Sequence, residues 1–285
     1  KNAYLRKKNI KSFWDTLDKK NLSKDIIRVT DQFISSESYN WSSKFWRHCI
    51  INHYKHMANS DPKIDPLHVI LRLDYAGFSF LDDFSVNECL EELNADVKLN
   101  LDLFKKHDGL SVSQSMQYNM VLLILYEKIK SKKIFNNYDY INTGLYKKYN
   151  PFLTIDGKII TQQLLISLLE FEKIKTLISN SKNKVQIIEL GAGYGRTANM
   201  ILSLMDNVKY VVADLPPSVY FAHKNLKEFF PNKKIIEGYN IDNKNDLLTA
   251  YEKSDVLFIF PHQLKFFSDK TFDVSLSIGN LCEME

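Results

Sequence analysis

The stretch Glu189-Leu-Gly-Ala-Gly-Tyr-Gly195 decides the fold that this sequence predicts. It comes directly after the apolar run that starts at Val185, and it precedes a stretch with helical spacing, Thr197 to Met205. A glycine-rich turn between a strand and a helix lets a ligand approach the backbone and points free N–H groups at an anion. The stretch therefore predicts a nucleoside-binding site at the end of a buried strand.

Two details of this turn bear on which cofactor it suits. The glycines are spaced G-x-G-x-G, and Arg196 stands where the dinucleotide fingerprint has its third glycine. Glu189 would also face a pyrophosphate, and like charges a few Å apart cost on the order of kcal/mol. S-adenosylmethionine carries an ammonium and a sulfonium instead, and its carboxylate can receive the N–H groups of the turn. The turn favours this cofactor, with NAD as the alternative.

An acid also ends the next apolar run, since Asp214 follows Tyr210 to Ala213. A carboxylate at that place can accept both ribose hydroxyls of a nucleoside, whichever cofactor carries it. Leu215 is then expected to pack on the adenine ring. A helix N-cap ahead of Pro216 is the alternative role for Asp214, and the two roles are compatible.

The rest of the second half alternates between short apolar runs and helical stretches. The further expected strands are Lys234 to Glu237, Val256 to Phe260 and Val274 to Ile278, and the further expected helices are Ser218 to Phe229 and Asn245 to Lys253. This alternation predicts βαβ units and an α/β fold, a Rossmann-like, doubly wound parallel sheet.

The first half reads as mainly helical. Helical spacing or capping residues predict helices over Asp15 to Phe33, Trp41 to Met57, Ser85 to Phe104, Ser113 to Lys130 and, later, Thr161 to Ser179. The segment from Tyr149 to Gly157 reads as a linker or turn. We therefore expect a helical region over 1–150 and a cofactor-binding domain over 151–285.

Composition excludes several classes of protein. With 285 residues, 45% apolar and 25% charged, the chain is an ordinary globular sequence of about two domains. No apolar run approaches the roughly 20 residues of a membrane helix, and no signal peptide is visible. A net charge of +4 with only five arginines argues against nucleic acid as a partner. Three cysteines without C-x-x-C spacing indicate reduced thiols in a cytoplasmic protein.

The second half of the chain resembles class I S-adenosylmethionine-dependent methyltransferases and, more narrowly, the bacterial family of putative sugar O-methyltransferases. The segments that carry the resemblance are Asn150-Pro151, Asp156 to Lys158, Glu189 to Ala198 (ELGAGYGRTA), Asp214 to Ser218 (DLPPS), Phe260 to Leu264 (FPHQL) and Phe272 to Met284 (FDVSLSIGNLCEM).

The resemblance implies a role for each matching position. The methionine end of the cofactor would lie on Glu189, Gly191, Gly193 and Gly195, and the ribose on Asp214. His262 and Gln263 would follow the third core strand and lie near the adenine. A rival register makes Lys234 to Glu237 the third strand, and Asn240 or Asp242 would then meet the adenine. The first register is preferred, because Phe272 to Val274 resembles the start of the family's fourth strand.

Methyl transfer to a sugar hydroxyl is helped by a base, because an alcohol is a poor acid. Glu283 and Asn280 come just past the fourth expected strand, where a doubly wound sheet places ligand groups. Glu283 is the first candidate base and His262 the second, and Asn280 is a candidate cofactor ligand. No pair of aspartates stands there, so we expect no metal. The aromatic cluster around Trp41 either forms an acceptor lid or fills a helical core.

The chain ends at Glu285, soon after the fourth expected strand. We therefore expect a fragment, further C-terminal sequence, or completion of the sheet by another chain. The expected function is O-methylation of a sugar or glycoconjugate, in bacterial surface polysaccharide modification. The alternatives are a methyltransferase for another small hydroxylated metabolite, a NAD-dependent oxidoreductase and a non-catalytic binding protein. The helical region is also a candidate oligomerisation surface.

Overall fold

The computed structural model describes residues 10–37, 42–71, 104–108, 110–178 and 184–278. Its elements, in chain order, are α1 (Ile10–Thr16), α2 (Lys24–Ser35), α4 (Lys44–Asn59), α7 (Val112–Lys130), η3 (Lys133–Tyr140), α8 (Gly144–Tyr149), β1 (Leu153–Ile155), β2 (Lys158–Ile160), α9 (Gln162–Ile178), β3 (Val185–Leu190), α10 (Arg196–Leu204), β4 (Val208–Ala213), α11 (Ser218–Phe229), β5 (Ile235–Glu237), η4 (Gly238–Asn240), α12 (Lys244–Lys253), β6 (Val256–Ile259), η5 (Pro261–Phe266) and β7 (Val274–Leu276).

The described chain forms two compact units. One unit takes the described residues of 1–70, 178–198 and 205–285, and the other takes those of 71–177 and 199–204. The division predicted at residue 150 stays a prediction. None of the helices in the described part of the chain is long and apolar enough to cross a membrane.

A five-stranded parallel sheet organises the first unit, so the expected α/β class is confirmed. Its strand order is β5-β6-β4-β3-β7. The chain enters this sheet at β3, places β4 beside it, forms β5 at the far end of the sheet and then β6 between β5 and β4, and returns to the other side of β3 with β7. The order of the strands reverses beside β3, and ligands of open parallel sheets bind outside the carboxyl ends of the strands at such a point.

This strand order also decides between the two registers left open by the sequence. Residues Val256–Ile259 of β6 pair with β4, and β7 pairs with β3, so Val256 onward is the third core strand as preferred. The segment Ile235–Glu237 pairs only with β6 among the described strands, so it does not occupy the third position. The rival register is wrong for this reason.

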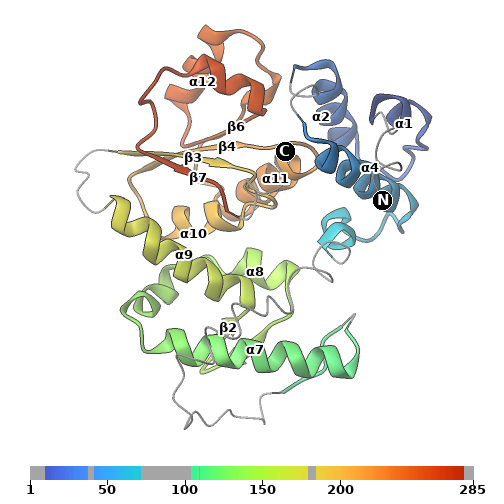
Figure 1. Ribbon diagram of the computed structural model, residues 1–285. Coiled ribbons are helices and arrows are strands. Elements are labelled where there is room, and N and C mark those ends of the chain that lie inside the picture. The colour runs from blue at the N-terminus through green and yellow to red at the C-terminus, as the bar shows by residue number, and fades with distance from the viewer. Residues whose placement is uncertain (1–9, 38–41, 72–103, 109, 179–183, 279–285) are drawn as a thin grey trace. The chain divides into compact units, whose positions relative to one another are not determined.

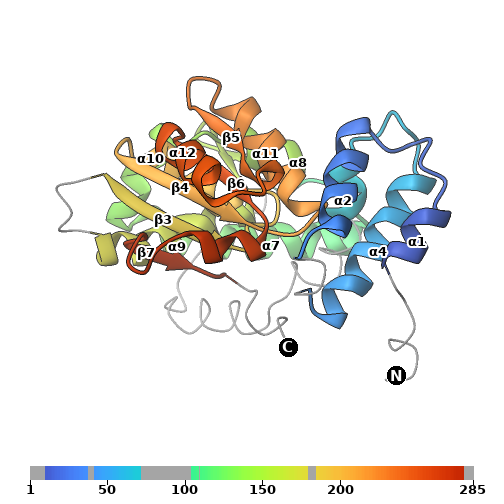
Figure 2. The same cartoon turned by 90° about the horizontal axis from the view of Figure 1, so that it is seen from above.

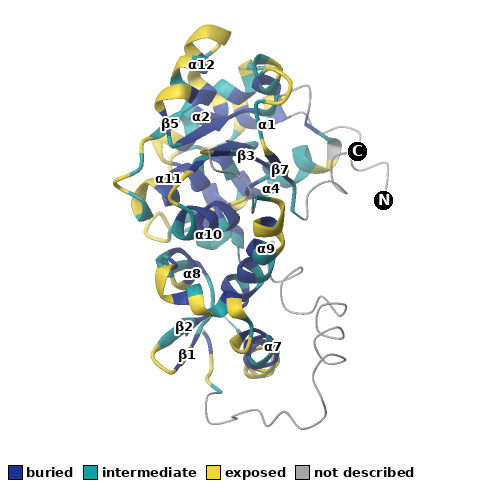
Figure 3. Ribbon diagram, turned by 90° about the vertical axis from the view of Figure 1, so that its left-hand side faces the viewer, coloured by how far each residue is buried: buried dark blue, intermediate teal, exposed yellow. Residues whose placement is uncertain are grey.

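The strands are almost continuously apolar because both faces of the sheet are covered. One face packs under α12 in a cluster formed by Ile188, Val211, Ala213, Leu247, Tyr251, Leu257 and Ile259. On the opposite face Tyr210, Val212 and Phe258 are buried, and the ring of His223 on α11 contacts Phe258. Figure 1 shows α12 and α11 on opposite sides of the sheet, and Figure 3 shows the buried strands between them.

The helices α1, α2 and α4 belong to the same unit as the sheet (Figure 2). Their side chains form a small core in which the rings of Trp14 and Tyr54 lie 4.8 Å apart. Phe33 of α2 reaches the end of β6, where its ring and that of Phe260 pack edge to face with their centroids 5.8 Å apart. Both side chains are fully buried, so α2 is part of the core at that corner of the sheet.

The single helix expected over Asp15 to Phe33 is wrong, because the chain forms α1 and α2 with a break between them. Ser23 marks the start of the second helix as the N-cap of α2: its hydroxyl accepts the N–H of Ile26 at 3.2 Å. The helices expected over Trp41 to Met57 and Ser113 to Lys130 are confirmed with small shifts of their ends. The helix expected from Ser85 lies outside the described residues.

The second unit contains α7, α8, α9 and the hairpin of β1 and β2. The segment Tyr149 to Gly157, expected as a linker or turn, ends in the expected turn but also contains the first hairpin strand, Leu153–Ile155, which was not predicted. Its turn is Asp156-Gly157, and both residues have positive φ, 50° and 74°. Asp-Gly is a strong signal for a two-residue hairpin turn, and the sequence predicted the turn without the two strands that it joins. The capping role expected for Thr161 is confirmed, since its hydroxyl accepts the N–H of Leu164.

Candidate functional site

The glycine turn after β3 has the conformation that only glycine adopts readily. Gly191, Gly193 and Gly195 all have positive φ, at 74°, 60° and 91°. The turn stays attached to the sheet, because the N–H of Gly191 donates to the carbonyl of Ala213 on β4 at 3.0 Å. The G-x-G-x-G spacing is therefore a backbone requirement of this turn.

Two of these glycines have different surroundings. A Cβ on Gly195 would lie 3.5 Å from both Ala222 and Leu226 of α11, an ordinary contact distance, so the positive φ rather than a lack of space favours glycine there. A Cβ on Gly193 would meet nothing within 4 Å. Gly193 thus leaves open space above the turn, next to the first residue of α10, where helix N–H groups attract anions.

The two predicted acids lie beside this turn, at the carboxyl ends of neighbouring strands. Glu189 is only 2% exposed, and its Oε2 accepts the hydroxyl of Tyr210 at 2.9 Å. Asp214 accepts the N–H of Gly193 at 2.9 Å through Oδ2 and the N–H of Leu215 at 2.6 Å through Oδ1. The structure therefore brings Asp214 and the glycine turn together in a direct contact.

Burial raises the pKa of Asp214 to about 7, and this effect outweighs the two backbone N–H groups, whose hydrogen bonds lower the pKa. The negative charge of Glu189 contributes a smaller part of this rise. Two carboxyl groups in one partly enclosed place disfavour a second negative charge. Such a place accommodates a positively charged ligand better than a pyrophosphate.

The start of α11 follows Asp214 closely. Pro216-Pro217 is a cis peptide bond, and Leu215 lies just before it, partly buried. The carbonyl of Leu215 accepts the N–H of Val219 in the first turn of the helix. Leu215 thus sits beside the acid, at the place from which it was expected to contact the adenine, a role that stays a prediction.

His262 and Gln263 lie in η5, directly after β6. His262 is 8% exposed, and burial lowers the pKa of its imidazole; the positive charge of Lys265 lowers it further, while Glu37 and Asp242 raise it. The imidazole is therefore disposed to be neutral at pH 7, the form that accepts a proton. Its expected roles near the adenine and as a base stay predictions.

Gln263 has its side-chain amide engaged by backbone groups. Its Nε2 donates to the carbonyls of Gly238 and Ile241 at 2.9 and 2.8 Å, and its Oε1 accepts the N–H of Phe260 at 2.7 Å. These bonds give Gln263 a structural role that the sequence reading missed. Its expected contact with the adenine stays a prediction, but the amide is already used.

The other candidates fall outside the described residues. Asn280, expected as a cofactor ligand, and Glu283, the first candidate base, both belong to 279–285. Within the described ranges, no group of three or more histidine, cysteine or acidic side chains is arranged to hold a metal ion.

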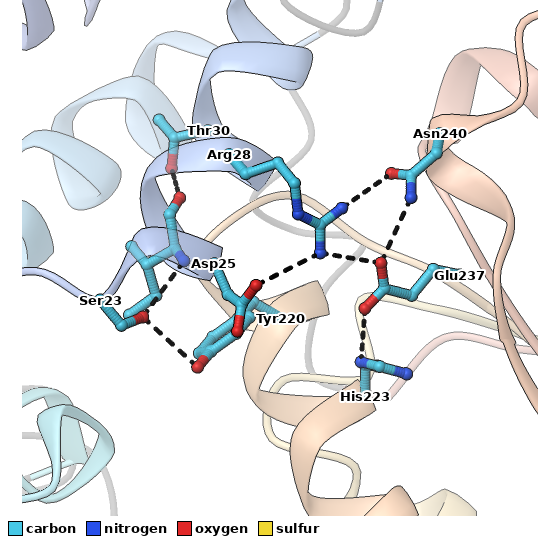
Figure 4. A network of polar contacts seen from close by, with 9 residues as sticks. Ser23, Asp25, Arg28, Thr30, Tyr220, His223, Glu237 and Asn240 are labelled. Carbon is cyan, nitrogen blue, oxygen red and sulfur yellow. Dashed lines mark hydrogen bonds and ion pairs between the residues drawn. The ribbon is translucent and has the colours of Figure 1, made fainter.

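Sequence reasoning also missed the ion-pair cluster around Glu237 (Figure 4). Arg28 of α2 lies 2.9 Å from one oxygen of Glu237, and His223 of α11 lies 3.2 Å from the other. The pKa of Glu237 is lowered although burial raises it, because His223 and Arg28 outweigh the burial. No local motif joins residues about 200 positions apart, so this cluster has no sequence signal.

Comparisons with family models, with curated proteins and with solved structures find no match to this chain.

Proposed function

We propose that this chain is a class I, S-adenosylmethionine-dependent methyltransferase with a Rossmann-like, doubly wound sheet. The observation that carries the proposal is the direct contact between the glycine turn and Asp214, with the buried Glu189 at the end of the strand before that turn. The site combines backbone N–H groups with two acids and lies where the strand order reverses. This is a suitable environment for a nucleoside that carries positive charge.

The residues of the site fit such a cofactor. The open space above Gly193 admits a ligand against the backbone, and the N–H groups of the turn and of α10 suit a carboxylate. Glu189 would hold the ammonium side, directly or through water, and Asp214 would accept the ribose hydroxyls. Gly191 and Gly195 would shape the turn, and Leu215 and His262 would border the purine.

The acceptor we propose is a sugar hydroxyl, on the strength of the resemblance to sugar O-methyltransferases. When bound, the cofactor supplies an electrophilic methyl group; the protein must orient the acceptor oxygen and take its proton. His262 is the described candidate for taking the proton, since its lowered pKa favours the neutral imidazole. Glu283 remains the other candidate.

Calorimetric titration with S-adenosylhomocysteine, and separately with NAD, tests the cofactor. We expect micromolar binding of S-adenosylhomocysteine and none of NAD. Glu189→Gln removes the negative charge but keeps an acceptor for Tyr210, so we expect weaker binding by about tenfold, the scale of one charged hydrogen bond. Binding of NAD alone would assign the site to an oxidoreductase, and silence with both would favour a non-catalytic protein.

A matched pair of glycine variants tests whether the turn itself contacts the ligand. Gly193 and Gly157 both have positive φ, 60° and 74°, and both lack neighbours within 4 Å of an added Cβ. Alanine at either position should cost about 1–2 kcal/mol of stability from the left-handed conformation alone.

Only Gly193→Ala should also weaken S-adenosylhomocysteine binding, because its methyl group enters the space above the turn. Urea unfolding gives the stability of both variants, and calorimetry gives their affinities. Equal affinities of the two variants would show that the ligand does not lie against this turn.

A further inference from the structure

Arg28 holds both ends of a short turn at the edge of the sheet (Figure 4). Its Nη2 lies 2.9 Å from Oε2 of Glu237, and its Nη1 donates to Oδ1 of Asn240 at 3.3 Å. Asn240 also donates to Glu237 at 3.2 Å. One guanidinium therefore links α2 to the residue before η4 and to the last residue of η4.

This link is better supported than an ordinary surface ion pair. The side chain of Glu237 is 26% exposed, and its second oxygen lies 3.2 Å from Nδ1 of the buried His223. Asp25, one turn before Arg28 on α2, lies 3.8 Å from the guanidinium. Exposed ion pairs contribute little, whereas a pair that shares several hydrogen bonds holds a defined geometry.

The same turn is joined to the segment after β6. Gln263, 1% exposed, donates to the carbonyls of Gly238 and Ile241 on either side of the turn, and it accepts the N–H of Phe260. Arg28 is therefore bonded to one side of the turn of residues 237–241 and Gln263 to its backbone, so the turn connects Arg28 with residues 260–263. Tyr239 strengthens this connection, because its ring stacks on Phe260 with centroids 5.4 Å apart.

We propose that Arg28 is a positioning residue for the purine side of the cofactor site, acting through residues 237–241 and Gln263 on the segment Phe260 to His262. This inference rests on the proposed function, because it takes that segment as the neighbour of the adenine. It assigns a specific task to α2, a helix that supplies none of the candidate site residues. The guanidinium sets the position of the segment without touching the ligand.

The test compares two ligands that differ only in the purine, S-adenosylhomocysteine and S-inosylhomocysteine. Arg28→Met keeps the apolar stem and removes the donors. We expect the wild type to prefer the adenine compound, and Arg28→Met to lose about tenfold in affinity for it, with a smaller loss for the inosine compound. Arg28→Lys, which can reach Glu237 but not Asn240 as well, should restore part of the preference.

Lys20→Met is the matched control, since Lys20 forms an exposed ion pair with Asp18 at 3.1 Å, apart from this network. It should leave both affinities unchanged. A merely structural role for Arg28 would lower the unfolding temperature but leave the ratio of the two affinities as in the wild type, and that result would overturn the inference. A wild type without preference would overturn it too. Failure of the wild type to bind either compound would overturn the proposed function itself.

Discussion

Asp214→Asn is expected to make the ligand-free protein more stable relative to wild type as the pH rises. The folded-state pKa of Asp214 is raised from 3.8 to about 7, so folding favours the protonated acid. That stability is fully present below the unfolded-state pKa and is lost as the pH rises to 7. Asparagine has no such dependence. Between pH 5 and pH 8 the unfolding free energy of the variant should rise relative to that of the wild type by up to about 3 kcal/mol.

Urea unfolding at the two pH values, without ligand, measures this shift. The amide of asparagine accepts only one of the two N–H groups that Asp214 holds, so the variant starts at pH 5 with a cost of about 1–2 kcal/mol. Asp206→Asn is the control, because Asp206 is exposed at the end of α10. If the difference in unfolding free energy between wild type and Asp214→Asn does not change with pH, then folding does not raise the pKa of Asp214.

The same variant should bind S-adenosylhomocysteine about a hundredfold more weakly, because an amide cannot accept two ribose hydroxyls as a carboxylate can. The affinity of the wild type should also fall as the pH drops below 7, since the ligand requires the ionised acid, while the affinity of the variant should stay flat. Calorimetry at pH 6, 7 and 8 measures both effects. An unchanged affinity would remove Asp214 from the ribose role, whatever its effect on stability.

The part of this fold that the sequence predicts well is the part built from local signals. Parallel strands buried on both faces read as apolar runs, and the helices between them have helical spacing. The position of the glycine turn could be predicted because glycine has few other reasons to recur at that spacing between a strand and a helix. Glu189 and Asp214 could be placed because the strands before them end together at one edge of the sheet.

The parts that the sequence did not predict depend on contacts between distant segments. Gln263 was expected to meet a ligand, but its amide joins two backbone turns more than 20 positions apart. Nothing in the sequence distinguishes Arg28 from the other four arginines, because its partner Glu237 comes 209 positions later. The apolar spacing over Asp15 to Phe33 also continues through the break between Thr16 and Lys24, where α1 has ended and α2 has not begun. The spacing of apolar residues indicates which side of a helix is buried, but it does not indicate which element packs against that side.

Phe260→Ala is expected to have the largest effect on stability, because this side chain joins three of those distant segments. Its ring is fully buried, stacked on Tyr239 of η4 and edge-on to Phe33 of α2. Removing a buried phenyl group leaves a cavity and costs about 3–5 kcal/mol, whereas Phe260→Leu should cost about 1–1.5 kcal/mol because most of the volume remains. Denaturant unfolding measures both values.

A comparison with Phe272→Ala separates this corner from a general loss of apolar contact. Phe272 is a partly buried ring that packs on Tyr251 and Phe267 beneath α12. Its removal should cost less and leave α2 unaffected. In Phe260→Ala the amides of α2 should exchange with solvent faster, because the helix loses the ring that Phe33 packs against. Equal exchange in the two variants, or a cost below 1 kcal/mol for Phe260→Ala, would mean that α2 is held to the sheet mainly by Arg28 and its partners rather than by this aromatic contact.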